Sequence, residues 1–571
     1  MPDIAVLSVL IPLALSWAIW RTTKALTSRS PLDTIPGPPP RSYLTGNIED
    51  LFGPDGWDYQ EYLAMNYPGV ARVPSVMGAV MLNVRDPKAL YHIILKDQHL
   101  FDESEDFTRV NDLLFGKGLL STLGEHHRRQ RKMLNPVFSV AHLRGMVPIF
   151  NEIGSKLCDS LRKEIGAGKT EIDVLAWMGR TALELIGQSG WGTSFDNLEP
   201  DVPLHPFHKS IKDIMQAATK FNVHRVFVIP YVNYLGTPRF RRFIVDLLPS
   251  KNVRVLRDII NNLHQTCLEV YESKKQALDV GDDAFHEQIG QGKDIISALM
   301  KANLLAAEKD KMPEEEIIAQ MSTLTFAATD TTSTALSRTL LLLSESPEVQ
   351  EKLREEIIDA KTEQGELLYD ELHQLPYLDA VCRETLRLYP PIGYVQRQAK
   401  EDAYIPLSHP IVSTDGKVMN EVMVPRGTDL NVSIVSCNRD PLIWGPDAHE
   451  WKPERWLSPL PQSVAEARIP GVYSNLQVSP LLSLSGRFNA HELVNLRMTF
   501  VGGGRACIGF KFSQLEMKVL LSLLLESFKF APTRKKIRWE FHGIAQPMID
   551  EGRVEGQGLR NLQLPLKISL L

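Results

Sequence analysis

A single cysteine stands inside a glycine-rich segment of the chain. In residues 500–509, FVGGGRACIG, Cys507 is flanked by glycines, and an apolar helical pattern begins at Phe510. Glycines let a backbone approach a flat ligand closely, and free backbone N–H groups at a helix start favour a thiolate. Arg505, two residues from the thiol, could pair with an anionic group on the same ligand. The alternative is a glycine-rich turn around a buried structural cysteine.

Two further segments place polar groups at helical spacing. Glu384 and Arg387 stand three residues apart, which puts opposite charges on one helix face. Asp330 and Thr331 interrupt an otherwise apolar helical pattern, where polar residues are unfavourable and a purpose is expected. The plainer interpretations are a surface ion pair worth little and a polar turn that faces solvent.

A basic segment lies nearer the N-terminus. His127 and Arg131 are four residues apart and therefore share one helix face. Arg128, Arg129 and Lys132 fall on other faces. These three residues form either a solvated charged surface or a docking patch for an acidic partner protein.

Taken together, these segments resemble the motifs of the cytochrome P450 haem-thiolate monooxygenases, in particular microsomal and fungal members. Residues 500–509 match the haem-ligating loop FxxGxRxCxG at every specified position. The resemblance implies that Cys507 is the axial thiolate ligand of the iron in haem b. It also implies that Arg505 contacts a haem propionate and that Phe500 packs beside the sulfur.

The charged pair resembles the structural ExxR motif of the same family. By this resemblance Glu384 and Arg387 are joined by Arg455, from Pro-Glu-Arg-Trp at residues 453–456, and hold the haem loop without taking part in the chemistry. Arg397, just beyond a double proline, matches a strand position that reaches a haem propionate in this family.

The polar helical segment resembles the AGxDTT stretch of the family's distal helix. Asp330 and Thr331 would form an acid–alcohol pair that holds water and relays protons, while Ala328 replaces the usual glycine. His127 and Arg131 match the WxxxR position, with histidine in place of tryptophan, and are the implied propionate partners.

The resemblance implies a monooxygenase of secondary metabolism. It would insert one oxygen atom from O₂ into a lipophilic small molecule, such as a terpenoid, sterol, fatty or aromatic compound. NADPH would supply the electrons through a membrane-bound cytochrome P450 reductase. The expected pocket walls are residues 106–120 and the distal helix around Phe326. A haem-thiolate isomerase or dehydratase that does not use O₂, and a non-catalytic haem protein, are the alternatives; retention of both Asp330 and Thr331 argues against the isomerase.

The composition is that of a folded, nearly neutral protein. The chain has 571 residues, of which 43% are hydrophobic and 23% charged, and its formal net charge is −6. These fractions exclude wholesale disorder and collagen, and the charge excludes a generic nucleic-acid-binding protein. The 5 cysteines are too sparse in so long a chain for a disulfide framework. They contain no CxxC pair, which argues against a cysteine-rich zinc site.

The elements that must position these residues are mostly helices. Residues 141–350 have apolar residues at helical spacing and few prolines or glycines. Pro313 followed by three glutamates predicts the start of a long helix that ends near Leu343. Alternation typical of strands is confined to short pieces such as 69–85 and 421–436. We therefore predict a mainly α fold with small β-sheets, the cytochrome P450 fold, as one large haem domain over residues 46–571.

The N-terminal segment predicts a membrane anchor. Residues 4–20 carry no charge and are followed by Arg21 and Lys24. The segment is just long enough to cross a bilayer, and the flanking cations favour a cytosolic body. A cleaved signal peptide is the alternative. We expect a single-pass anchor over 1–24 in the endoplasmic reticulum membrane.

Three other segments carry predictions. The proline-rich run at residues 35–40 predicts a stiff hinge inside a linker over 25–45. Residues 226–234 form either a membrane-dipping access loop or ordinary core. Residues 477–497 interrupt a stretch that in many fungal members runs straight into the haem loop. They are either a surface insertion or translated intron sequence.

Overall fold

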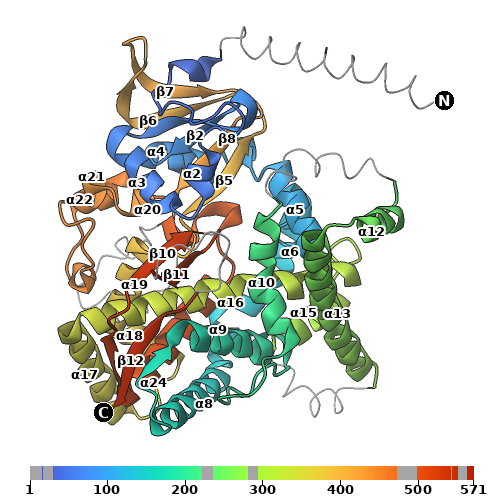
Figure 1. Ribbon diagram of the computed structural model, residues 1–571, viewed down its shortest axis with the longest axis vertical. Helices are drawn as coiled ribbons and strands as arrows, with labels where there is room; N and C mark the ends of the chain where they lie inside the picture. Colours follow the sequence, from blue (N-terminus) through green and yellow to red (C-terminus); the bar gives the residue numbers. More distant parts are fainter. Residues whose placement is uncertain are drawn as a thin grey trace. The chain divides into compact units, whose positions relative to one another are not determined.

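The chain folds into two compact units, a smaller one built on β-sheets and a larger one made mainly of helices. The computed structural model describes residue 16 and residues 30–221, 236–280, 294–471, 498–541, 543–550 and 562–571. The smaller unit comprises the described residues up to Asp102 together with Gln396–Ser433, and the larger comprises those of Glu103–Val395 and Ile434–Leu571. Helices with small sheets (Figure 1) confirm the predicted fold class.

The smaller unit is built on a five-stranded sheet. Its strands lie in the order β1, β2, β8, β5, β3, with bounds Val70–Pro74, Val80–Val84, Asp429–Ser433, Tyr394–Ala399 and Phe101–Asp102. The first two strands pair antiparallel and β8 pairs parallel to β2. A second sheet pairs β6 (Ala403–Val412) with β7 (Val418–Val424). The helices of this unit are α2 (Ile48–Phe52), α3 (Gly56–Asn66) and α4 (Pro87–Tyr91).

The predicted strand pieces fall in these sheets. Residues 69–85 contain β1 and β2, as the alternation indicated. The piece 421–436 contains the end of β7 and all of β8, but α20 (Ile434–Asn438) begins directly after Ser433. The last residues of that predicted strand are therefore helical and fully buried.

Helices dominate the larger unit. Before its central helix come α5 (Glu105–Phe115), α6 (Gly124–Leu134), α7 (Val140–Arg144), α8 (Val147–Gly166), α9 (Val174–Leu185), α10 (Pro206–Thr219), α12 (Pro238–Leu247), α13 (Lys251–Val280) and α15 (Ile295–Leu305). After it come α17 (Pro347–Gln364), α18 (Tyr369–Gln374), α19 (Pro376–Leu388), α21 (Pro441–Trp444), α22 (Gln462–Ala467) and α24 (Phe510–Ser527). The small sheets of this unit contain β4 (Glu171–Asp173), β12 (Pro565–Leu570) and β9 (Phe528–Pro532), and the pair β10 (Ile537–Phe541) and β11 (Ala545–Ile549).

The central helix of the larger unit is α16, Glu314–Glu345 (Figure 1). Pro313 is its N-cap and three glutamates form its first turn, which confirms the predicted start. Acidic side chains there are favoured by the helix dipole. The helix packs against α9, α10, α13 and α24, and most of its residues are buried.

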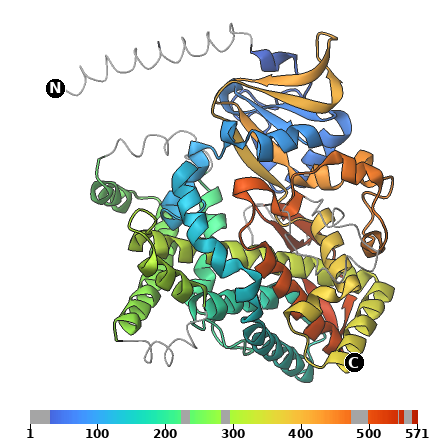
Figure 2. The same cartoon turned by 180° about the vertical axis from the view of Figure 1, so that it is seen from behind.

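The glycine-rich segment leads into α24, as the apolar pattern from Phe510 predicted. This helix packs against α8, α16 and α17 (Figure 2). Its contacts explain why the pattern is apolar on nearly all faces, since α24 is enclosed on several sides.

Some predictions fall outside the described residues. These are the anchor at 4–20, the access loop at 226–234 and the interruption at 477–497. Within the described ranges, no helix combines the length and the apolar character needed to cross a membrane. The boundaries 1–24, 25–45 and 46–571 stay predictions.

Candidate active site

The loop before α24 presents Cys507. Its backbone N–H donates to the Phe500 carbonyl at 2.9 Å, which folds the loop back on itself. Gly502 permits this path, because a β-carbon there would lie 2.7 Å from the Pro470 carbonyl oxygen. Gly503 has a φ of +69°, in the region that favours glycine. Cys507 is exposed, whereas the other four cysteines are buried.

The pKa of the Cys507 thiol is raised above its ordinary value of 9.0. Protein atoms surround the sulfur closely enough for burial to raise its pKa, and the Gly509 amide and the Arg131 guanidinium lower that pKa by less. A metal ion bound to the sulfur would deprotonate it outright. The site therefore suits a metal-bound thiolate better than a free nucleophile.

Two arginines fix the loop to its surroundings. Arg131 of α6 donates to the Ala506 carbonyl at 2.5 Å, and Arg505 donates to the Thr122 carbonyl at 2.7 Å. Burial lowers the pKa of Arg131, Arg505 lowers it further, and Cys507 raises it. The two guanidiniums and the thiol are therefore close enough to act on one another.

The other basic residues of α6 are either buried or paired with acidic side chains of the protein. His127 is buried in this helix, one turn before Arg131. Of the basic residues proposed as a docking patch, Arg129 pairs with the buried Glu316 of α16 at 3.3 Å. Arg128 pairs with Glu125 at 2.7 Å and Lys132 pairs with Asp310 at 3.0 Å, and both of these cations remain mostly exposed.

The buried helix α16 becomes accessible at its polar stretch. Ala327 is exposed, and Thr331 one turn later is partly exposed. The Thr331 hydroxyl donates to the Ala327 carbonyl at 2.7 Å. Asp330 is only 6% exposed, and burial raises the pKa of its carboxyl to about 6, against a smaller opposing effect of Lys212. An acid with this pKa can both accept and release a proton near neutral pH.

Two contacts connect this stretch with other predicted parts of the site. Phe326 stacks on Phe115 of α5 with ring centroids 4.8 Å apart, so the two predicted pocket walls touch. The hydroxyls of Thr332 and Ser513 lie 3.2 Å apart and join α16 to the helix that follows Cys507. In the segment 106–120, Leu114 and Phe115 are buried in the core, while Leu113 is exposed.

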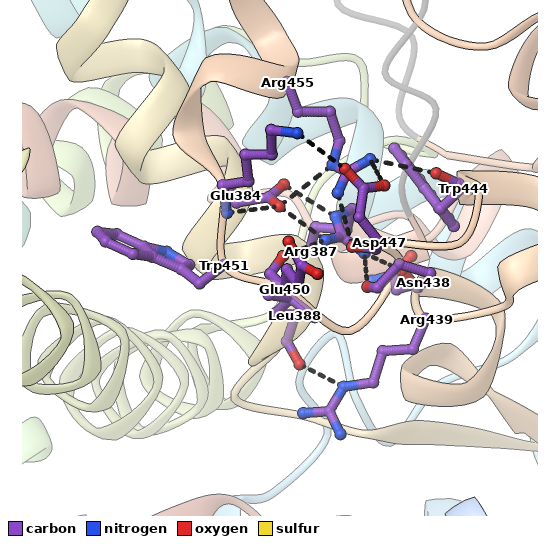
Figure 3. Close-up of polar contacts among 12 residues, drawn as sticks. Glu384, Arg387, Leu388, Asn438, Arg439, Trp444, Asp447, Glu450, Trp451 and Arg455 are labelled. Atoms are coloured by element: carbon purple, nitrogen blue, oxygen red, sulfur yellow. Dashed lines mark hydrogen bonds and ion pairs between the residues drawn. The ribbon is translucent and has the colours of Figure 1, made fainter. Parts of the chain in front are cut away.

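The predicted charged triad is assembled around Glu384 (Figure 3). Arg387 donates to both Glu384 carboxylate oxygens, at 2.9 and 2.7 Å, and both side chains are 0% exposed. The Arg455 Nε lies 3.3 Å from the same carboxylate. A buried carboxylate flanked by two guanidiniums costs about 3–5 kcal/mol to break.

Three other residues complete this network and were missed by the motifs. Asp447 accepts from Arg455 at 2.7 Å, and the Trp456 indole donates to Glu384 at 2.9 Å. The Asn438 side chain accepts from the Met498 N–H at 2.9 Å and so ties the network to the cysteine loop. Trp456 directly follows Arg455 in the sequence, but no local signal pointed to Asp447 or Asn438.

Arg397 belongs to the smaller unit. It lies in β5, is buried, and donates to the Gln396 carbonyl at 2.7 Å. Its contact with a haem propionate stays a prediction.

The residues around Cys507 fit a haem. The donor set is one accessible thiol with two guanidiniums acting on the same region. This combination suits a flat ligand with a metal at its centre and anionic groups at its edge. Within the described residues, no cluster of histidine, cysteine and carboxylate side chains offers a separate metal site.

Comparisons with known proteins agree with this geometry. The family model "Cytochrome P450" matches residues 36–548. The chain is 48% identical over 533 residues to cytochrome P450 monooxygenase 91 of Postia placenta, covering 93% of this chain and 94% of the relative. It is 41% identical over 559 residues to ganoderic acid synthetase of Ganoderma lucidum, covering 96% and 97%. A P450 monooxygenase of Hericium erinaceus is 37% identical over 550 residues, covering 95% and 94%.

Proposed function

The chain belongs to the cytochrome P450 family, and from that premise we propose that it inserts one atom of O₂ into a lipophilic small molecule with electrons from NADPH delivered by a reductase. The observation that carries this proposal is the accessible thiol of Cys507 beside two guanidiniums. Retention of both Asp330 and Thr331 favours it over an isomerase that does not use O₂.

Each residue of the site has a task in this proposal. A haem bound here would supply the iron chemistry that activates oxygen. Cys507 would hold the iron, and the Gly509 amide and Arg131 would stabilise the thiolate. Arg131 and Arg505 would balance the negative charge of the propionates, together with the predicted partners His127 and Arg397.

Asp330 and Thr331 would manage protons and water on the other side of the site. With its pKa near 6, the buried Asp330 carboxyl can take a proton and give it up at physiological pH. The Thr331 hydroxyl lies at the accessible stretch of α16 and can rotate from the Ala327 carbonyl to hold water.

A lipophilic substrate is supported by the apolar side chains at the site. The half-buried Phe326, stacked on the buried Phe115, gives this stretch of α16 an aromatic side chain next to the exposed Ala327. The name of one relative, ganoderic acid synthetase, also supports a small-molecule reaction. A terpenoid, sterol, fatty or aromatic compound would fit these features.

We also propose a membrane location, on the endoplasmic reticulum with a cytosolic catalytic body. The uncharged residues 4–20 support it, and so does α12, where Phe240, Phe243 and Leu247 are exposed. Arg239 and Arg242 lie on the same short helix. A short helix with exposed aromatic and basic residues is typical of the bilayer interface. The exposed Arg128 and Lys132 would meet an acidic reductase.

The reduced-CO difference spectrum tests the cofactor and its ligand together. The unaltered protein should show the red-shifted ferrous–CO band of a thiolate ligand, and Cys507→Ala should abolish it. Cys158→Ala is the matched control. This buried thiol belongs to α8, far in sequence from the loop that contains Cys507, and it makes only a weak contact to the Leu523 carbonyl. A band that persists in Cys507→Ala would refute the assignment.

Turnover with labelled oxygen separates the proposed reaction from its alternatives. Purified protein, reductase and NADPH are incubated with a panel of lipophilic compounds under ¹⁸O₂. Product that carries one ¹⁸O atom supports the monooxygenase. Rearranged product without label would support the isomerase, and binding without product on any compound would support a non-catalytic haem protein.

A further inference from the structure

The segment that joins α5 to α6 lies directly against α16. Gly118 makes the closest approach: a β-carbon on it would be 2.5 Å from the Thr323 hydroxyl oxygen and 3.1 Å from the Ala319 carbonyl oxygen. The Leu119 N–H donates to the Oε1 atom of Gln320 at 3.1 Å, and Gln320 is 0% exposed. This irregular backbone is therefore held by close packing and by a buried side chain of the central helix.

A buried glutamine of α6 fastens the same segment. Gln130 is 0% exposed. Its Nε2 atom donates to the Lys117 carbonyl at 2.9 Å and to the Glu316 carboxylate of α16 at 2.7 Å. Its Oε1 atom accepts from the Thr122 hydroxyl at 2.9 Å. Because a carbonyl and a carboxylate can only accept, these contacts fix which way round the amide lies. One amide thus joins α6, α16 and the segment between α5 and α6.

The carboxylate of Glu316 is a fixed acceptor for this amide. Its Oε1 atom lies 2.8 Å from the His126 Nε2 atom and 3.3 Å from the Arg129 guanidinium, while its Oε2 atom accepts from Gln130. Glu316 is only 6% exposed. A buried carboxylate with such partners is costly to detach from them, so the amide is tied to a rigid point on α16.

Arg505 of the cysteine loop rests on the same segment. It donates to the Thr122 carbonyl at 2.7 Å and to the Leu119 carbonyl at 3.5 Å. Thr122 therefore meets the glutamine through its hydroxyl and the arginine through its carbonyl. The path from α16 to the cysteine loop consists of three contacts of 2.9 Å or less, through Glu316, Gln130, Thr122 and Arg505.

We propose that Gln130 is a positioning residue, whose amide clamps residues 117–122 to α16 and thereby fixes Arg505 for an anionic edge group of the haem. The inference rests on the proposed function, in which a haem is held at Cys507. An arginine loses much rotamer freedom when it binds a ligand, and acceptors that are already fixed in place reduce that loss. Without the amide, the acceptors of Arg505 would move with a loosened segment.

The first test measures the segment itself. Amide hydrogen exchange of the purified protein, followed by mass spectrometry, reports on the peptide that contains residues 117–122. Gln130→Met nearly keeps the side-chain volume but removes the amide, and should speed exchange of this peptide roughly tenfold or more, because local opening becomes easier. Thr122→Val removes only the hydroxyl and should act in the same direction by less. It also carries the test if Gln130→Met folds poorly.

Gln350 supplies the matched control. It is a glutamine of α17, 1% exposed, whose amide donates to the Leu343 and Phe530 carbonyls and accepts from the Phe530 N–H, each at 2.9 Å. Gln350→Met therefore removes an equally buried amide whose partners lie outside residues 117–122 and the cysteine loop. It should lower the stability of the protein and leave exchange of residues 117–122 unchanged.

The second test measures how fast haem is lost to an excess of apomyoglobin. Gln130→Met should release haem severalfold faster than the unaltered protein, and Gln350→Met should not. Arg505→Gln should also release haem faster, and adding Gln130→Met to it should change the rate little, because both act through one contact path.

Unchanged exchange of residues 117–122 in both Gln130→Met and Thr122→Val overturns the clamp. Unchanged haem release in Gln130→Met overturns its link to Arg505, and so does equal acceleration by Gln350→Met. If the unaltered protein gives no thiolate-type ferrous–CO band, the proposed function fails, while hydrogen exchange still decides whether Gln130 clamps the segment.

Discussion

The Thr331 hydroxyl is held by the helix it belongs to. It donates to the Ala327 carbonyl one turn earlier, a contact that serine and threonine often make inside helices. Thr329 makes the same kind of bond to Thr325 at 2.8 Å, but on the buried side of α16. These two threonines therefore share their chemistry and differ in access to the site.

Replacing Thr331 with alanine should uncouple the enzyme. Haem should remain bound, but product per NADPH should fall severalfold and hydrogen peroxide should rise, because the hydroxyl that we propose to hold water is lost. Thr331→Ser should restore coupling, and Thr329→Ala should leave it unchanged. Peroxide and product are measured in the same reaction. Intact coupling in Thr331→Ala would end its assigned role.

At the scale of elements, the network around Glu384 joins α19 to the segment that leads to Cys507. Glu384 accepts from Arg387, Arg455 and Trp456. Asn438 accepts from Met498 at the start of the cysteine loop. The network is therefore expected to control both stability and haem retention.

Two variants of this network should lower the stability of the protein, Glu384→Gln by more than Trp456→Phe. Glu384→Gln should lower the free energy of unfolding by about 3–5 kcal/mol, because two guanidiniums lose their buried partner. Trp456→Phe should cost about 1–3 kcal/mol, since it leaves one carboxylate oxygen with fewer donors. Urea unfolding and haem content are the measurements.

An exposed ion pair between α17 and Glu454, the residue before Arg455, supplies the control. Lys352 lies 3.3 Å from Glu454, and both side chains are substantially exposed. Lys352→Met should change stability by less than about 1 kcal/mol. Equal effects of Lys352→Met and Glu384→Gln would contradict the structural role of the network.

Helix α24 contains a buried acid that the mechanism does not use. Glu516 is 0% exposed, and neither of its carboxylate oxygens has a hydrogen-bond partner within the described residues. Burial raises its pKa well above the ordinary value of 4.5. The side chain is therefore protonated in the folded protein at pH values where the unfolded chain has released the proton.

This acid should make stability fall with rising pH. Its folded pKa lies above its unfolded pKa, so its contribution is fully present below about pH 4.5 and is lost as pH rises through the folded pKa. The free energy of unfolding should decline by up to about 1.4 kcal/mol per pH unit in that window. Glu516→Gln should remove this slope, whereas Glu526→Gln, at the exposed end of α24, should keep it. Urea unfolding at several pH values measures both, and equal slopes in all three proteins would contradict the prediction.

At the scale of the whole molecule, residues 477–497 are expected to be dispensable. The described residues that flank residues 472–497 contact one another. On one flank are Pro470 and Gly471, and their carbonyls lie against Gly502 on the other flank. The chain path on both sides of the interruption is therefore held by contacts outside it.

Deleting residues 477–497 should leave a folded protein with the same ferrous–CO band, because a surface insertion adds only a modest loop-closure entropy. The yield of haem protein and the thermal unfolding midpoint check this. Loss of the band would show that the segment supports the cysteine loop. Sequencing the transcript decides its origin: a message that contains these codons throughout ends the intron hypothesis.

The sequence by itself determined the family and the main helices, and it also carries the prediction that Cys507 is the ligand cysteine. The residues of each motif stand close together in the sequence: Cys507 with its glycines, Glu384 with Arg387, and Asp330 with Thr331. The start of α16 at Pro313 is likewise a local property, because proline and acidic residues act within one helical turn. Local propensity and spacing suffice for features of this kind.

Only the tertiary structure decided which distant residues meet. Asp447 and Trp456 complete the Glu384 network. Arg129, which was predicted to belong to a docking surface, pairs with the buried Glu316. Gln130 of α6 meets Thr122 and Glu316 through one amide. Such contacts depend on how separate elements pack against each other. A contact between two segments far apart in the chain produces no repeating pattern in the sequence of either segment, so the sequence alone does not predict it.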